Sequence, residues 1–208
     1  MKQAIDPHQT PRGHAFDLWM SSPMPMVTLT KTFEVGHVRR VAKCKNVKFN
    51  MLMCHCITKT AVANRHFYLL PENGQLYRYD KIAVNVIVKN AEGGINSCDI
   101  PYSDDLGQFN RDYLDRTRRC SDECQSLFLE DCMIVGTSTL VDSEIDNIVN
   151  QYSDRFHNPL LAWGRYRHHL FRTTLPISLQ FHHVQMDGAD GAAFLEQLQQ
   201  TFNKLSFK

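Results

Sequence analysis

The residues best suited to chemistry stand close together near the C-terminal end of the chain. Residues 182–188 read His-His-Val-Gln-Met-Asp-Gly, which places two imidazoles and one carboxylate within seven positions. An imidazole can accept a proton near neutral pH, because the unperturbed pKa of histidine lies there. One of His182 and His183 could therefore act as a general base, with Asp187 fixing the local architecture.

The sequence on either side of this segment predicts the elements that must position it. Residues 175–181 alternate between apolar and polar types, which predicts a strand. Apolar residues with helical spacing follow from 195 to 205. Because neighbouring strand residues face opposite ways, His182 and His183 cannot both point at one site. We expect one histidine to serve the chemistry and the other to pack or form a hydrogen bond.

Two other interpretations of the histidine segment need weighing. The pair could be two surface histidines followed by a helix cap, with no chemical role. A metal site is a further alternative, but adjacent strand histidines diverge and no third ligand stands at metal-binding spacing. We therefore expect no metal.

Composition limits the class of protein. The chain has 208 residues, 43% of them hydrophobic, which predicts one domain over residues 1–208 with a substantial core. A net charge of +1 argues against a nucleic-acid partner. No apolar run is long enough to span a membrane, and residues 1–11 do not resemble a signal peptide. Seven cysteines without paired spacing predict reduced thiols in a cytoplasmic protein.

Hydrophobic patterning predicts an α/β fold, a sandwich of strands and helices. Residues 82–88 are almost wholly apolar, so we expect that strand to be buried on both faces. We expect residues 1–11 to be irregular and residues 90–99 to form a loop or a turned edge. Strands are predicted at 26–33, 67–70, 75–79, 82–88, 133–140 and 175–181, and helices at 35–44, 48–64, 104–124 and from 191 onward.

The segment from His182 to Gly188, with Ala-Ala-Phe-Leu at 192–195, resembles the active-site signature of the chloramphenicol acetyltransferase family. The resemblance extends in order and spacing from about residue 12 to 202. The other matching segments are Arg12 with Phe16, Lys48-Phe49, the run from Leu76 to Asp80, the stretch from Pro101 to Leu114, and Arg165-Tyr166.

The resemblance implies a role for each matching residue. His183 would be the general base, and Asp187 would form a buried ion pair with Arg12 that holds the histidine loop. The hydroxyl that binds the tetrahedral intermediate would be that of Thr139 or Ser138.

The resemblance also implies the substrates and the assembly. The co-substrate would be acetyl-CoA, with Lys48, Arg165 and Tyr166 along the coenzyme A path. The acceptor would be a hydroxyl of chloramphenicol or a similar small alcohol, near Phe16 and Trp19. The implied assembly is a homotrimer with a mixed β-sheet in each subunit. In it, His183 of one subunit faces the substrate groove of its neighbour.

Three departures from the family pattern touch the acceptor pocket rather than the base. The family's Pro-Trp pair is missing from residues 133–137, Ala162 stands where a threonine is usual, and Trp19 where a tyrosine is usual. Acetyl transfer is therefore a firmer expectation than chloramphenicol as the acceptor. Two alternatives stay open: an acyltransferase of the dihydrolipoamide type, and a catalytically idle homologue that binds a hydrophobic ligand.

Overall fold

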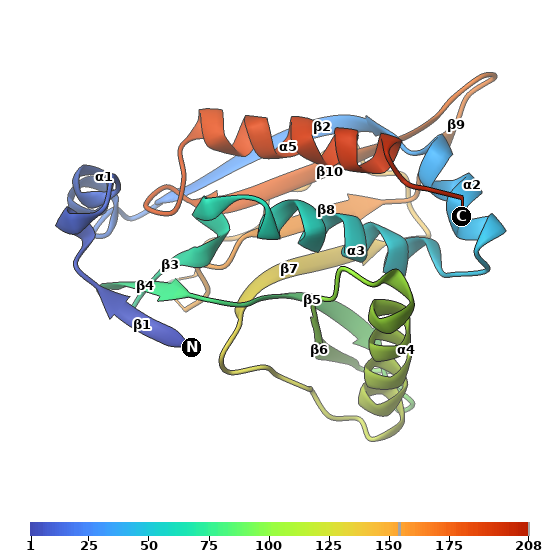
Figure 1. The fold of residues 1–208 in the computed structure, drawn as a ribbon, viewed down its shortest axis with the longest axis horizontal. Coiled ribbons are helices and arrows are strands. Elements are labelled where there is room, and N and C mark those ends of the chain that lie inside the picture. The colour runs from blue at the N-terminus through green and yellow to red at the C-terminus, as the bar shows by residue number, and fades with distance from the viewer. Residues whose placement is uncertain (154, 208) are drawn as a thin grey trace.

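A mixed seven-stranded sheet forms the centre of the computed structural model, which describes residues 1–153 and 155–207 (Figure 1). Its strands are β2 (Met26–Glu34), β5 (Ile82–Lys89), β6 (Ile95–Pro101), β7 (Met133–Leu140), β8 (Leu160–Gly164), β9 (Arg167–His168) and β10 (Thr173–His182). Their order is β2-β10-β8-β7-β5-β6, with the short β9 beside β10. β7 runs parallel to β8 and β5, and the other pairs are antiparallel. This arrangement confirms the α/β class.

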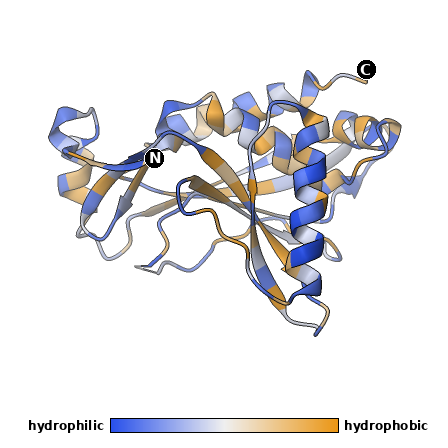
Figure 2. Cartoon of the chain, turned by 60° about the horizontal axis from the view of Figure 1, so that its bottom comes forward, coloured by the Kyte–Doolittle hydropathy of each residue, from blue (hydrophilic) through white to orange (hydrophobic). Residues whose placement is uncertain are grey.

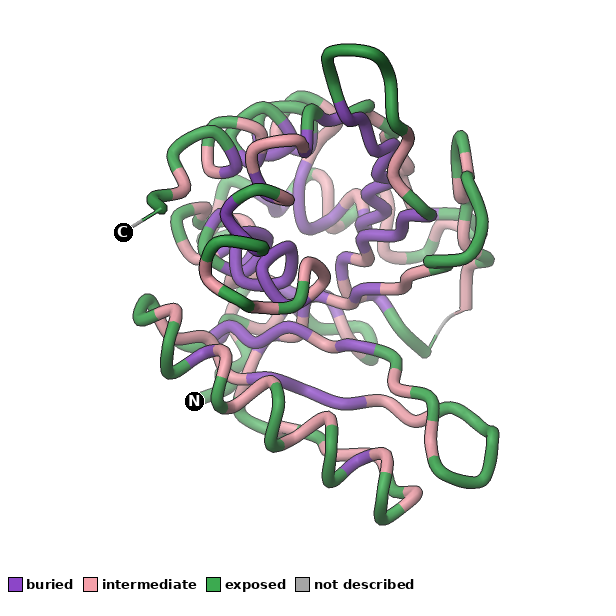
Figure 3. Tube along the Cα trace, turned by 90° about the vertical axis from the view of Figure 1, so that its right-hand side faces the viewer, coloured by how far each residue is buried: buried purple, intermediate pink, exposed green. Residues whose placement is uncertain are grey.

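Helices pack on one face of this sheet, and many residues of the strands and of the helices against them are buried (Figure 3). The helices are α3 (Phe49–Val62), α4 (Leu106–Asp122) and α5 (Gly188–Asn203), and α2 (Gly36–Cys44) packs against α3 and α5. Because α3 also contacts α2, α4 and α5, nearly every side of it is buried. By contrast, α4 presents a mainly hydrophilic outer surface (Figure 2). Its first turn is capped by Asp105, whose side chain accepts a hydrogen bond from the Gln108 amide at 2.7 Å.

The opposite face of the sheet is polar. The hydroxyls of Thr30 on β2 and Ser178 on β10 lie 2.8 Å apart. Both also contact Asn147 Oδ1, at 2.5 Å and 3.0 Å. The segment that connects β7 to β8 therefore runs across the β2–β10 part of this face and is fixed there by side-chain hydrogen bonds.

A second, three-stranded sheet carries the N-terminal part of the chain. Its strands are β1 (Lys2–Ile5), β3 (Leu69–Glu72) and β4 (Gln75–Tyr79), in the order β1-β4-β3. The predicted hairpin is confirmed: Asn73 and Gly74 both have positive φ, 48° and 74°, as a two-residue hairpin turn requires. The expectation that residues 1–11 are irregular is wrong, because β1 pairs with β4 and a 3-10 turn (Pro7–Gln9) follows it. The short helix α1 (Gly13–Trp19) comes next, and a second 3-10 turn (Arg65–Tyr68) precedes β3.

Two expectations about β5 and its neighbour need correction. The stretch predicted as a loop at 90–99 contains most of β6, which forms a hairpin with β5. The second half of β5 is not buried on both faces, since Ile87 is 45% exposed. The reason is that β7 pairs with β5 only as far as Asn85, so the end of β5 has β6 alone beside it.

The described residues contain no helix that is both long and apolar enough to cross a membrane. All seven cysteines are free thiols, as the spacing predicted, and Cys54, Cys56, Cys98 and Cys120 are buried.

Gly164, at the end of β8, permits a close approach of the chain. The Arg165 amide donates to the Ser143 carbonyl at 2.6 Å, so the crossing segment lies against the strand. A Cβ at position 164 would lie 2.4 Å from that carbonyl oxygen and 2.9 Å from the Ile145 nitrogen, both main-chain atoms.

We expect Gly164→Ala to lower the free energy of unfolding by about 1–3 kcal/mol, because the crossing segment must move away from β8. Urea denaturation measures the change. Gly188→Ala is the matched control, because a Cβ there meets no atom within 4 Å. Equal stability of the two variants would contradict this account of residue 164.

Candidate active site

His183 lies immediately beyond the end of β10, in the turn that leads into α5. Its main-chain amide donates to the Pro25 carbonyl at 2.8 Å, which ties the turn to the segment before β2. Its ring stacks on the Trp19 indole, with centroids 4.5 Å apart and planes 4° from parallel. The side chain is 26% exposed, so the imidazole is held in place yet open to solvent.

His182 is placed differently, as the strand alternation predicted. It is fully buried, and its Nδ1 accepts a hydrogen bond from the Val184 amide at 3.1 Å. Its ring lies 4.7 Å from that of His157. Burial lowers the pKa of His182 to about 3, so this imidazole stays neutral and supports the turn.

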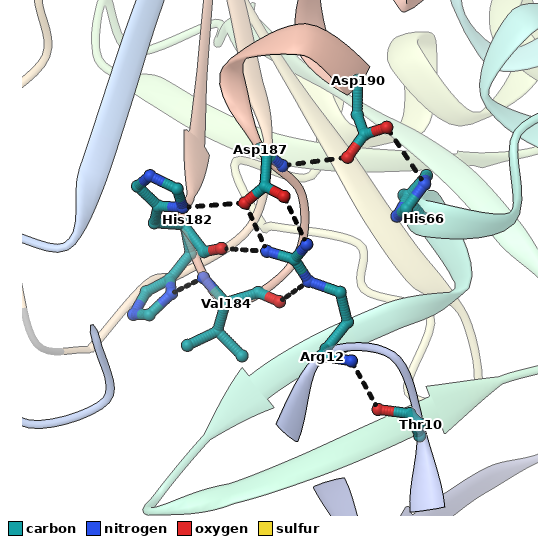
Figure 4. A network of polar contacts seen from close by, with 8 residues as sticks. Thr10, Arg12, His66, His182, Val184, Asp187 and Asp190 are labelled. Atoms are coloured by element: carbon teal, nitrogen blue, oxygen red, sulfur yellow. Dashed lines mark hydrogen bonds and ion pairs between the residues drawn. The ribbon is translucent and has the colours of Figure 1, made fainter. Parts of the chain in front are cut away.

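Arg12 joins the elements of the site (Figure 4). Its Nε donates to the Val184 carbonyl at 2.9 Å, and its Nη2 donates to the His183 carbonyl at 2.6 Å. Its two terminal nitrogens also hold the Asp187 carboxylate, at 2.8 Å and 2.9 Å. Only 7% of Arg12 is exposed, so one guanidinium fixes both main chain and carboxylate with charge-assisted hydrogen bonds.

The expected ion pair between Arg12 and Asp187 is present, but it is not buried at both ends. In the single chain, half of the Asp187 side chain is exposed. The hydrogen bond from Arg12 lowers the pKa of Asp187, which therefore stays ionised. Asp187 Oδ1 lies 3.2 Å from His183 Nδ1 but without hydrogen-bond geometry, so the carboxylate faces the imidazole as a nearby charge.

Asp187 also stands at the start of α5, and Asp190 supports it. The Asp187 amide donates to Asp190 Oδ2 at 3.1 Å, and Asp190 Oδ1 lies 3.5 Å from the ring of His66 (Figure 4). Asp187 and Asp190 therefore cap the first turn of α5. Three elements fix the position of His183: β10 before it, α5 after it, and α1, which carries Trp19.

The two candidates for the hydroxyl, Ser138 and Thr139, point to opposite faces of the sheet. Thr137 marks the helix side, because its Oγ1 lies 3.9 Å from Cys54 Sγ of α3. Thr139 shares that side, whereas Ser138 shares the polar face with Gly136. Beside Ser138 in the adjacent strand is Ala162.

Three adjacent pairs of β7 and β8 residues line this polar face: Gly136 with Leu160, Ser138 with Ala162, and Leu140 with Gly164. The first pair lines a cavity of about 450 Å³. Gly164 lines a second cavity, of about 940 Å³, at the end of β8, and its walls also include Phe49 of α3 and Tyr113 of α4 from the helix side. Ser138 therefore shares its face of the sheet with the smaller cavity.

Lys48, Arg165 and Tyr166 all line the larger cavity, together with Phe49. Phe49 packs edge-on against the Tyr166 ring at 5.4 Å, and Arg39 covers that ring at 4.6 Å. The structure thus brings together the three residues that the resemblance places along the coenzyme A path.

The chain does not bring His183 to this cavity. Arg167, two residues after Arg165, pairs with Thr174 near the start of β10. His183 lies nine positions further along the strand direction, roughly 30 Å at the usual rise per residue. Within one chain, the histidine and the larger cavity are therefore at opposite ends of the sheet.

Sequence reasoning missed one contact and two residues of this region. Trp19 was expected near the acceptor, but its stacking on His183 had no sequence signal. Asp99 and Asn85, which line the smaller cavity, were passed over. Asp99 fell in a predicted loop, and nothing in its local pattern marks a buried carboxylate.

We expect Arg12→Ala to lower the free energy of unfolding by about 2–4 kcal/mol, because two carbonyls and one carboxylate lose a buried donor. Chemical denaturation measures the loss. The control is Arg40→Ala, which removes an exposed guanidinium from α2. An Arg12 variant as stable as this control would contradict the role assigned to the clamp.

The chain is similar to known proteins over most of its length. The family model described as chloramphenicol acetyltransferase matches residues 2–199. Chloramphenicol acetyltransferase 3 of Escherichia coli is 23% identical over 182 residues, 85% of each chain. The Proteus mirabilis enzyme is 20% identical and covers 94% of this chain and 92% of its own.

Solved structures show the same fold. A chloramphenicol acetyltransferase structure has a TM-score of 0.82 at 21% identity and covers 97% of this chain and 100% of its own. An Azotobacter vinelandii dihydrolipoamide acetyltransferase has a TM-score of 0.66 at 17% identity, with 92% and 85% covered. Because the family model spans nearly the whole sequence, the chain belongs to the chloramphenicol acetyltransferase family and is an acyltransferase.

Proposed function

We propose that this protein transfers an acetyl group from acetyl-CoA to a hydroxyl of chloramphenicol or a similar small alcohol, with His183 as the general base. The observation that carries the proposal is the Arg12 clamp. It donates hydrogen bonds to the main-chain carbonyls of His183 and Val184 and to the carboxylate beside the imidazole. Such a clamp fixes a part-exposed imidazole, as a base that must meet two substrates requires.

The chemistry is direct transfer. His183 takes the proton of the acceptor hydroxyl as its oxygen attacks the thioester carbonyl carbon of acetyl-CoA. The resulting oxyanion is stabilised by a hydroxyl donor, for which we assign Ser138 rather than Thr139, since Ser138 lies on the face that carries the smaller cavity. Losing such a donor costs on the order of 3 kcal/mol in transition-state stabilisation. The intermediate collapses, the C–S bond breaks, and coenzyme A leaves with the proton from His183.

The larger cavity supports acetyl-CoA as the co-substrate. Lys48 and Arg165 are exposed at its wall, where two cations suit the phosphates of coenzyme A. Arg165 also lies 3.7 Å from Glu144, so a phosphate would compete with one carboxylate there. Tyr166 contributes an aromatic wall that Phe49 and Arg39 hold in place.

A homotrimer would complete the site. His183 of one subunit would face Ser138 and the two cavities of its neighbour, which explains why its own chain leaves the histidine far from the larger cavity. Half of the Asp187 side chain is exposed in the single chain, and an adjacent subunit would cover it. Phe16 and Trp19 on α1 would then flank the acceptor beside the imidazole.

We expect His183→Ala to lower acetyl transfer to chloramphenicol by about a thousandfold or more, because the base is lost. Release of the coenzyme A thiol gives the rate, and analytical ultracentrifugation gives the assembly, which should stay trimeric. His14→Ala, an exposed position of α1, serves as the control and should keep full activity. Activity of the His183 variant equal to that of the control would remove the base assignment. If the wild type acetylates dihydrolipoamide and not chloramphenicol, the acceptor assignment is wrong.

A further inference from the structure

The smaller cavity on the polar face of the sheet is lined by polar side chains, among them Asn85 and Asp99, that no step of the proposed chemistry uses. It extends as far as β2, because Met26, one of its lining residues, is the first residue of that strand. Its volume is about 450 Å³, enough for a small organic molecule. At its far side, β5 and β6 contribute Asn85 and Asp99.

Asp99 is a buried carboxylate that forms no ion pair with any of the described residues. It is only 3% exposed. Its oxygens accept hydrogen bonds from Asn85 Nδ2 at 2.6 Å and from the Leu129 amide at 2.9 Å, both neutral donors. Arg116 donates to the main-chain carbonyl of Asp99 and not to the carboxylate. Burial raises the pKa of Asp99, and the hydrogen bonds from Asn85 and Leu129 and the nearby charge of Arg116 oppose that shift only in part.

A carboxylate has about four acceptor positions, and the protein fills two of those on Asp99. A buried charge that lacks an ion-pair partner is costly, and the cost falls when a cation binds beside it. Asp99 is therefore a place where a positively charged hydrogen-bond donor would be favoured over a neutral one.

The rim of the same cavity is apolar and aromatic. Phe128 and Phe156 line it, and they are 66% and 65% exposed in the single chain. Large exposed aromatic rings beside a cavity are typical of sites that bind apolar groups. A molecule that fits this cavity has an apolar or aromatic body beside Phe128 and Phe156 and a cationic group beside Asp99.

We propose that the acceptor is an amphipathic amino alcohol, whose ammonium group binds Asp99 while its apolar body packs between Phe128 and Phe156. This inference rests on the proposed function, because it identifies the cavity's occupant as the acceptor. It departs from chloramphenicol itself, whose amide nitrogen is uncharged.

The test compares two alcohols of equal shape. One is 2-(dimethylamino)-1-phenylethanol, whose tertiary amine carries a positive charge and is not a stable site for acetylation. The other is its uncharged isostere, 3-methyl-1-phenylbutan-1-ol. Calorimetric binding is measured without acetyl-CoA, and acetyl transfer to each alcohol is measured separately by thiol release. Chloramphenicol is included as a third acceptor.

We expect the amino alcohol to bind at least about tenfold more tightly than the isostere, as a buried charge-assisted hydrogen bond would give. In Asp99→Asn the preference should vanish, whereas Asp115→Asn, an exposed carboxylate on α4, should keep it. Phe156→Ala should weaken the binding of both alcohols by the same factor. If the Asp99 variant folds poorly, the Phe156 variant still tests whether the alcohols bind in this cavity.

The possible outcomes separate this inference from the proposed function. Equal binding of the two alcohols by the wild type, or a preference that survives in a folded Asp99→Asn, overturns the amino-alcohol assignment, even if chloramphenicol is acetylated. Selective binding of the amine without any acetyl transfer supports the cation site and overturns the proposed function instead.

Discussion

The candidate site depends on the contacts of one guanidinium. Arg12 immediately precedes the short helix α1, yet the four hydrogen bonds of its side chain all end in the turn between the last strand and the last helix. A single planar group with five donors can hold two carbonyls and a bidentate carboxylate at once, which a lysine cannot do. The clamp explains why two segments at opposite ends of the sequence meet at His183. It also explains why Asp187 is an anchor rather than a proton relay.

The pleat of the sheet determines how the rest of the site is divided. Alternate residues of β7 and β8 face the helices, where Thr137 and Trp163 are buried. The others face the polar side, where Gly136 and Leu160 line the smaller cavity and Ser138 lies beside Ala162. One face of the sheet therefore packs against the helices, and the other carries the smaller cavity. Gly164 contributes both to the fold and to a cavity. It allows the segment that connects β7 to β8 to lie against β8, and it lines the larger cavity.

The sequence predicted most of the elements because their patterns are local. Helix α3 and strands β7 and β10 follow from hydrophobic spacing, and the hairpin turn follows from Asn73-Gly74. Strand β1 could not be predicted this way, since Lys2–Ile5 is mostly exposed and is a strand only because β4 pairs with it. The same holds for β6, whose pattern is interrupted by polar residues that face the cavity. The clamp residues were identified through family resemblance, whereas the buried state of Asp99 arises from packing that no local pattern records.

The measurement that most directly tests the central claim is complementation between two inactive variants. His183→Ala lacks the base but keeps an intact groove, and Ser138→Ala keeps the base but has an impaired groove. If the base of one subunit serves the groove of the next, co-folding equal amounts of the two should restore about a quarter of the wild-type sites in mixed trimers. The account predicts this recovery, above the summed activity of the separate variants. Mixed trimers no more active than that sum would show that each chain uses its own histidine and would contradict the shared site.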